Sequence, residues 1–322
     1  CTTWSRAYSR QLRRCRYVDP RSVRQLDGVP KYPSGLCMLP GGVLVTTSYE
    51  PNNSSNSGGE TAVKFIAARN DSDPQALAAC QASGLAARRF EFLMGLAHTN
   101  DGLLAFSYDG ASAALYKFAK NGSMDELATV PALADYDRGF KKLAVHQQTQ
   151  RTYAIAGDAD EGNHALVILD AHLQVVATVE ATSGTQEDID DEDYEPIRDV
   201  AVHGDQVIVL TDNAHDKGSG LRLLDLDGRF LRTIAARQFI NPQAVAALYG
   251  RAFVVDDDDD DDVGPGKVLH VIDIQSGDIF QSVRFGCDTG PSIAILVDGD
   301  EIYISSFGAS KIAVLRFAGS EA

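Results

Sequence analysis

Two runs of carboxylates are the residues of this sequence best suited to chemistry. Seven consecutive aspartates follow an apolar segment, and a second run, EDIDDEDYE at 187–195, holds seven further carboxylates. Ca²⁺ takes six to eight oxygen ligands, so calcium binding is one chemistry that such runs could support. Attraction of a basic partner is a second, and solvated loops without a ligand are a third. The candidate metal ligands are Asp256, Asp257, Asp258, Asp259, Asp260, Asp261, Asp262, Asp188, Asp190, Asp191 and Asp193.

The spacing of these acids argues against one tight calcium site. A contiguous run cannot wrap every side chain around a single ion. The segment DADEGNHALVIL, which begins at Asp158, has Leu169 where an EF-hand loop needs a bidentate glutamate. If calcium binds, we therefore expect weak binding of several ions.

The charge distribution narrows the choice of partner. The formal net charge is −16, and the two acidic runs account for 14 of these charges. An acidic field of this strength repels phosphate, so we expect no nucleic-acid partner. The sequence has no apolar stretch of about 18 residues, so we expect no transmembrane segment.

A repeat of strand-like segments organises the chain. An apolar strand, a short turn with Gly or Asp, a second apolar strand, a polar loop and a third strand recur at intervals of 45 to 60 residues. This period is typical of propeller blades, and the fold class that it predicts is all-β, a six-bladed β-propeller. The second residues of the first strands are Leu36, Leu96, Leu143, Val200, Val245 and Ile293.

The two ends of the repeat region predict how the ring closes. The sixth unit ends near Phe317 after its third strand, while residues 16–27 belong to no unit. We therefore expect the N-terminal strand to close the last blade and to cover an exposed sheet edge. The predicted organisation is a basic amphipathic arm at 1–15, the propeller at 16–317 and a tail at 318–322.

Two smaller segments have patterns of their own. Trp4, Tyr8 and Leu12 form a stripe at helical spacing in the arm, which either docks on a partner or packs on the propeller itself. The segment 71–87 has Asp73 as a candidate N-cap and Pro74 at the first helical position, so we expect a short helix there.

The repeats resemble those of the NHL-type six-bladed propeller family. INPQAVAALYGRAFVVDD and LRLLDLDGRFLRTI carry the Pro-x-x-apolar-Ala-Val strand, the second strand that ends in Asp, and the Asp-x-x-Gly turn of that family. The resemblance covers about residues 16–317 and implies the architecture. It does not imply one function, because such propellers include enzymes, receptor ectodomains and scaffolds.

In a propeller, the loop from the second to the third strand shares a face with the loop that enters the first strand. The run 256–262 is expected to form one such second-to-third loop, and 187–195 enters the neighbouring blade. Both acidic runs should therefore emerge on one face. Other carboxylates expected at equivalent loops are Asp158, Asp160, Glu161, Asp212 and Asp216.

The alternative function is a tunnel-based, metal-dependent hydrolase or lyase of the six-bladed type. The resemblance implies a metal held by residues at the inner strand entrances, where only Asp199 and Asn241 are suitable. Lys141, Lys142 and Arg198 oppose cation binding there.

Three histidines recur at turns that follow the first strands of different blades. They are His98, His146 and His203. We expect structural turn histidines rather than a shared zinc site, because repeat-equivalent positions in separate blades lie far apart.

Cysteines and sequons favour a secreted or extracellular glycoprotein. The five cysteines allow up to two disulfides with one left over. The glycosylation candidates are Asn52, Asn53, Asn70 and Asn121. The chain begins at Cys1 rather than Met, so we expect a trimmed product, and a bacterial lipoprotein modified at Cys1 is the alternative.

Taken together, these patterns predict a non-enzymatic binding or assembly module. We expect it to engage a protein partner, and its acidic face would bind that basic partner or calcium.

Overall fold

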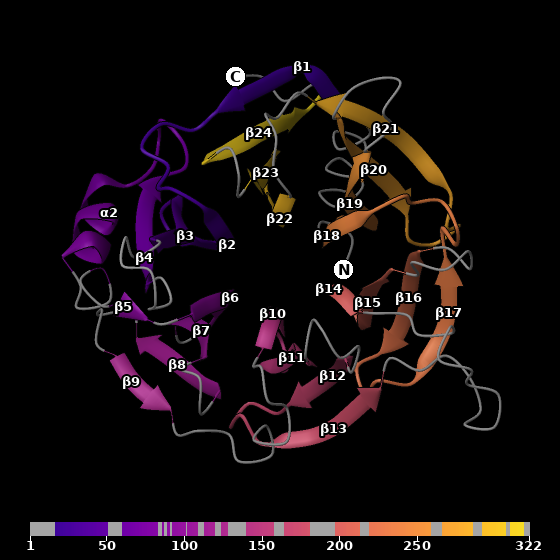
Figure 1. Ribbon diagram of the computed structural model, residues 1–322, viewed down its shortest axis with the longest axis horizontal. Coiled ribbons are helices and arrows are strands. Elements are labelled where there is room, and N and C mark those ends of the chain that lie inside the picture. The colour runs from indigo at the N-terminus through magenta and orange to yellow at the C-terminus, as the bar shows by residue number, and fades with distance from the viewer. Residues whose placement is uncertain are drawn as a thin grey trace, which may run out of the picture.

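The described strands form six four-stranded antiparallel sheets arranged in a ring around a central axis (Figure 1). This arrangement confirms the predicted all-β propeller. The computed structural model describes residues 17–50, 60–82, 86, 89–90, 92–100, 102–108, 113–119, 124–127, 140–157, 164–180, 197–212, 219–258, 266–285, 292–306 and 310–318. The predicted arm at 1–15 lies outside these residues. Within the described part, no helix is long and apolar enough to cross a membrane.

Five sheets follow the chain outward from the axis, and the sixth takes its outer strand from the start of the described chain. The innermost strands are β2 (Pro33–Leu39), β6 (Phe92–Thr99), β10 (Phe140–His146), β14 (Ile197–His203), β18 (Pro242–Leu248) and β22 (Ser292–Asp298). The second strands are β3 (Val43–Glu50), β7 (Gly102–Tyr108), β11 (Arg151–Gly157), β15 (Gln206–Thr211), β19 (Arg251–Asp258) and β23 (Glu301–Ser306). The third strands are β4 (Glu60–Ala67), β8 (Ala113–Ala119), β12 (His164–Leu169), β16 (Gly220–Asp225), β20 (Gly266–Asp273) and β24 (Lys311–Phe317). The outer strands are β5 (Arg89–Phe90), β9 (Met124–Leu127), β13 (Val175–Glu180), β17 (Phe230–Ile234), β21 (Ile279–Phe285) and β1 (Val18–Gln25).

The N-terminal strand closes the last sheet, as predicted. β1 pairs antiparallel with β24, from Val18 opposite Phe317 to Gln25 opposite Ala313, and the sheet order is β1-β24-β23-β22. In Figure 1, β1 lies outside β24 at the top of the ring. The pairing gives β24 a partner on its outer side, so this strand does not end the sheet with an unpaired edge.

The Asp-x-x-Gly turns set the geometry between third and outer strands. Asp225 Oδ1 accepts hydrogen bonds from the backbone N–H groups of Asp227 and Arg229, at 2.9 Å each. Gly228 has φ +84°, which favours glycine, and a Cβ there would lie 2.6 Å from Val179 of the neighbouring sheet. The turn is therefore fixed both by its own backbone and by close packing on β13.

The core consists of apolar side chains between neighbouring sheets. Phe253, Tyr153 and Tyr303, all on second strands, are among the largest fully buried side chains. The predicted short helix is also present: α2 (Pro74–Gln81) begins after Asp73, whose side chain accepts a hydrogen bond from Gln75 N. This helix lies in the connection between β4 and β5 of the first sheet.

Every innermost strand meets its second strand through a register shift near its entrance. Such a bulge leaves backbone groups out of the regular ladder. Polar side chains near the axis must form hydrogen bonds with these backbone groups. Side chains used in this way are less available to bind a ligand.

Candidate functional site

Asp256, the first aspartate of the seven, is a structural residue at the end of β19. Its side chain is buried, with 2% relative exposure. Oδ1 accepts a hydrogen bond from Asn241 N at 2.7 Å, and Oδ2 accepts one from Ile240 N at 2.9 Å. These two residues lead into β18. The carboxylate thus holds the entrance of the innermost strand with both of its oxygens.

Asp257 is held by a cross-strand ion pair. It lies directly opposite Lys267 in the β19–β20 register, and Lys267 Nζ is 3.2 Å from its Oδ1. Both residues are buried, so each charge is compensated by the other. The strand continues to Asp258, which pairs with Gly266. The expectation that 256–262 forms one loop is therefore wrong for its first three residues, because the buried Lys267 lengthens the strand.

Asp256 also contacts a histidine on the next strand. His270 Nε2 lies 3.4 Å from Asp256 Oδ2, and His270 Nδ1 lies 2.9 Å from Ser282 Oγ. The order of carboxylate, imidazole and hydroxyl is that of an activated serine. However, Ser282 lies within outer strand β21 directly opposite His270, and the 3.4 Å contact exceeds normal hydrogen-bond length. We interpret the chain as cross-strand structure.

Most of the predicted acidic ligands lie outside the described residues. These are Asp259, Asp260, Asp261, Asp262, Asp188, Asp190, Asp191 and Asp193, together with Asp158, Asp160, Glu161 and Asp216. Across the described part of the chain, no group of three or more His, Cys, Asp or Glu residues is arranged to hold a metal ion.

The strands that flank the two acidic runs are described, and they end on the same side of the ring. The first run begins within the last residues of β19, and the second precedes β14. Ile197 pairs with Thr211 at the entrance of β14, just as Pro242 pairs with Asp256 at the entrance of β18. Since β14 and β18 are neighbouring innermost strands, the described flanks of both runs lie at one face.

Asp212, another predicted member of the acidic face, is also engaged. It directly follows the second strand of the fourth sheet, β15, and is buried, at 7% exposure. Arg198 contacts its Oδ2 through Nε at 2.9 Å and through Nη2 at 2.5 Å. In both sheets, a carboxylate near the end of the second strand therefore fixes the innermost strand.

The centre of the ring holds a cavity of about 60 Å³ to which every innermost strand contributes. Its lining consists of Ser34, Gly35, Leu36, Gly95, Leu96, Lys142, Leu143, Asp199, Val200, Val245, Ala294 and Ile295. This volume accommodates water molecules but no substrate of ordinary size.

Asp199 is the carboxylate among those described lining residues. Its Oδ1 accepts a hydrogen bond from Val200 N at 2.8 Å, and its Oδ2 accepts one from Val245 N at 2.9 Å. Lys142 Nζ is 4.0 Å from Oδ2. Burial raises the pKa of Asp199, and Lys142 and the two N–H donors oppose this rise. The residue joins two neighbouring sheets at the axis.

The predicted tunnel ligands are therefore not gathered around a vacant cation position. Both oxygens of Asp199 accept backbone hydrogen bonds, and a lysine lies beside it. Asn241 Oδ1 accepts a hydrogen bond from Gln243 Nε2 at 2.6 Å, and Asn241 does not line the cavity. The side chain of Lys141 falls outside the description.

The repeated histidines serve turns in separate sheets. His203 Nε2 accepts a hydrogen bond from Gly250 N at 2.9 Å, and burial lowers the pKa of this histidine, which favours the neutral acceptor form. His146 Nδ1 lies 2.7 Å from Thr149 Oγ1 in its own turn. The backbone oxygen of His98 accepts from Gln147. These contacts agree with the structural interpretation.

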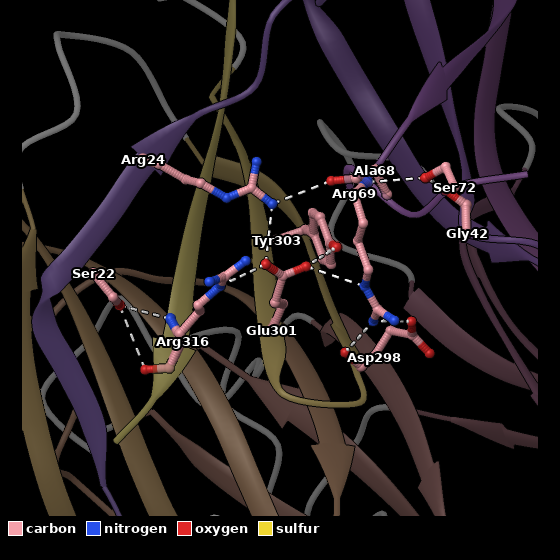
Figure 2. A network of polar contacts seen from close by, with 10 residues as sticks. All are labelled: Ser22, Arg24, Gly42, Ala68, Arg69, Ser72, Asp298, Glu301, Tyr303 and Arg316. Carbon is pink, nitrogen blue, oxygen red and sulfur yellow. Dashed lines mark hydrogen bonds and ion pairs between the residues drawn. The ribbon is translucent and has the colours of Figure 1, made fainter. Parts of the chain in front are cut away.

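A cluster of arginines around one glutamate escaped the sequence reasoning. Glu301, which begins β23, is 3% exposed. Its Oε1 accepts from Arg24 Nη2 at 3.0 Å and from Arg316 Nε at 2.8 Å. Its Oε2 accepts from Arg69 Nε at 3.2 Å and from the Tyr303 hydroxyl at 2.5 Å. Figure 2 shows these side chains converging on Glu301 from β1, β24 and the segment after β4.

The hydrogen bonds to Glu301 outweigh the effect of its burial. They lower its pKa from 4.5 to about 2, while burial and the same contact raise the pKa of Tyr303. Arg69 additionally donates to the backbone and side-chain oxygens of Asp298, at 2.9 and 2.5 Å. We call this set of Arg24, Arg69, Asp298, Glu301, Tyr303 and Arg316 the closing cluster, because it joins β1, β24 and the first sheet.

The sequence features that bear on compartment are only partly described. Asn70 is exposed, whereas Asn52, Asn53 and Asn121 lie outside the described residues. Cys37 is a free thiol, and burial raises its pKa to about 12, which keeps it protonated. Cys1, Cys15 and Cys287 are outside the description.

Comparison with known proteins found similar solved structures of low sequence identity. No family model matches the sequence, and no curated protein matches it. One similar solved structure is BamB from Moraxella catarrhalis, at 14% identity over 91% of this chain and 85% of that chain, with a TM-score of 0.43. Another is a chain of a nidogen/laminin complex, at 10% identity over 80% of this chain and 84% of that chain, with a TM-score of 0.46. At such identities and scores, the functional argument rests on the residues of this chain.

Proposed function

We propose that this chain is an NHL-type, six-bladed propeller that acts as a non-enzymatic binding or assembly module. Its acidic face would receive a basic segment of a protein partner. Six four-stranded sheets closed by β1 support the count of six blades. The Asp256 contacts to Ile240 and Asn241 support the NHL resemblance, since they give a structural reason for the second strand that ends in Asp.

The observation that carries this proposal is how the first acidic run is anchored. Asp256 and Asp257 are buried and engaged by protein groups, so they hold both strands that border the run. Asp259–Asp262 follow directly, and the second acidic run borders the neighbouring sheet on the same side. Two groups of like charge that emerge at one face would attract cationic segments and accelerate their association.

Binding of a basic peptide tests this assignment. We would compare the wild type with a variant in which Asp259, Asp260, Asp261 and Asp262 are replaced by Asn. The control variant replaces Asp71, Asp205, Asp278 and Asp300 by Asn, which removes equal charge from turns at the other end of the strands.

Fluorescence anisotropy with a labelled lysine-rich peptide provides the measurement. We expect the affinity for the peptide to fall about tenfold in the loop variant and less than threefold in the control variant. In all three proteins, the affinity should fall as the salt concentration increases. Equal weakening in both variants would show that only net charge matters and would overturn the proposed face.

Calcium is the second ligand that the carboxylate runs support. If the ion binds the folded state, calcium at 100 times its dissociation constant should add about 2.7 kcal/mol of stability. Thermal unfolding in millimolar CaCl₂ is compared with unfolding in NaCl of equal ionic strength. A shift that disappears in the loop variant supports calcium binding there, and the absence of any shift in the wild type removes calcium from the proposal.

We also propose an extracellular location with glycan attachment. The exposure of Asn70 supports the second point, since an acceptor asparagine has to reach solvent. Expression in a secreting eukaryotic cell, followed by treatment with an N-glycosidase, tests it. A mass that does not change on treatment would contradict glycosylation.

A further inference from the structure

Beside the closing cluster lies a cavity of about 360 Å³, lined by Ser22, Arg24, Asn70 and Arg316. Its walls come from three parts of the chain: β1, β24 and the segment between β4 and α2. This volume lies at the lower end of the range of about 300–1,000 Å³ found for ligand pockets. Figure 2 shows that Arg24 and Arg316 approach Glu301 from two different strands.

The two arginines are only partly neutralised. They share a single carboxylate oxygen, Oε1 of Glu301. Three guanidinium groups in the closing cluster face two carboxylates, those of Glu301 and Asp298, which leaves one positive charge in excess. This local excess contrasts with the net charge of −16 of the whole chain.

Several N–H donors of these arginines also have no acceptor. Within the described part of the chain, Arg24 Nη2 and Arg316 Nε make the guanidinium contacts, and the terminal nitrogens of Arg316 have no protein partner. Arg24 Nε is buried without a hydrogen-bond partner. The side chains are 36% and 38% exposed, so a ligand can reach them from solvent. A donor without an acceptor is unfavourable, and a ligand oxygen would satisfy the terminal nitrogens of Arg316.

We propose that this cavity binds an oxyanion, a phosphate or sulfate group carried on a larger polar molecule. The planar donor sets of arginine suit the oxygens of such groups. Asn70 adds an exposed amide at the rim, and Ser22 Oγ is already used, because it donates to Asp19 O and accepts from Arg316 N. Since the cavity exceeds the size of an inorganic anion, the rest of the ligand occupies the space toward Asn70.

The occupied site would join three parts of the ring closure. A single anion in contact with Arg24 and Arg316 bridges the first and last strands of the ring, and contact with Asn70 extends the bridge to the first sheet. The ligand would therefore stabilise the closed ring. The surface involved is distinct from the acidic face, because Arg316 lies near the end of third strand β24 and Asn70 follows third strand β4, at the opposite strand ends.

Two substitutions at Asn70 distinguish phosphate binding in this cavity from general effects of salt. Asn70→Asp places a carboxylate at the rim without touching the Glu301 contacts, while Asn70→Ala removes only the amide. Both abolish the same glycosylation sequon. Thermal unfolding of non-glycosylated wild type and both variants is followed while inorganic phosphate, glucose 6-phosphate or glucose is titrated against chloride of equal ionic strength.

We expect a saturable stabilisation of the wild type and of Asn70→Ala by both phosphates, with glucose 6-phosphate binding the more tightly, and no effect of glucose. Asn70→Asp should weaken phosphate binding at least tenfold. A shift of equal size in all three proteins would indicate exclusion of phosphate from the surface and would overturn the site. So would the absence of any phosphate effect beyond that of chloride.

Discussion

The axis and the closing seam of the ring each contain a buried carboxylate, but the two are stabilised differently. Asp199 accepts two backbone N–H groups and has a lysine 4.0 Å away, and its pKa is raised. Glu301 is surrounded by three arginines and a tyrosine, and its pKa falls to about 2. Burial determines the sign of the shift at Asp199, whereas hydrogen bonds from the tyrosine and the arginines outweigh burial at Glu301.

The two carboxylates should differ most in the folding stability that is lost when the negative charge of each is removed. Glu301→Gln leaves three arginines without their shared anion, and we expect a loss of about 3 kcal/mol, at the low end for a broken buried ion pair because the arginines are partly exposed. Urea unfolding at pH 7 provides the measurement. The control is Asp300→Asn, an exposed acid next to Glu301, which should change stability by less than about 0.5 kcal/mol. Equal stability of Glu301→Gln and the wild type would contradict the importance of the cluster.

Acid should destabilise the closing seam through Glu301. The folded-state pKa of Glu301 is about 2 against 4.5 when unfolded, so its contribution is complete above pH 4.5 and is lost as the pH falls towards 2. After allowance for solvent screening, we expect a loss of about 2 kcal/mol over this interval. Stability curves of the wild type and of Glu301→Gln should therefore converge below pH 4.5. If the two stability curves stayed parallel below pH 4.5, the loss of stability in acid would come from other carboxylates.

Asp199 should respond in the opposite sense and by less. Because folding raises its pKa above 3.8, its contribution becomes less favourable as the pH rises through that value. Asp199→Asn removes this charge but leaves one of two backbone donors without an acceptor, so we expect a net loss of about 1 kcal/mol at pH 7. Relative to the variant, the wild type should gain stability on acidification. A gain for the variant instead would mean that Asp199 is charged and favourably paired.

The ring architecture could be predicted because it repeats. Strand spacing near 45 residues placed the sheets, the unclaimed segment 16–27 predicted the closing strand, and Asp73 before Pro74 predicted α2. Each of these signals lies within a short stretch of sequence or in its recurrence. Local patterns of this kind can be recognised in the sequence because each of them belongs to a single strand, turn or helix.

The burial of Asp256 and Asp257 could not be read from seven identical residues, because such a run has no periodicity. Lys267 on the following strand was the available signal, since a lysine opposite an acid can extend a ladder. The closing cluster was inaccessible for another reason. Arg24, Arg69, Glu301 and Arg316 are scattered over nearly the whole chain, and they become neighbours only when the first strand reaches the last sheet.

The pairing of β1 with β24 also sets an order of events during synthesis. Val18 leaves the ribosome well before its partner Phe317, which is made 299 residues later (317 minus 18). At about 5–20 residues per second, the first strand waits roughly 15–60 s for a partner. The contacts of Arg24 with Glu301 and Ala68 form when β1 pairs with β24. A nascent chain stalled before residue 301 would consequently carry a ring that has not closed, with Arg24 still free for chaperones to contact.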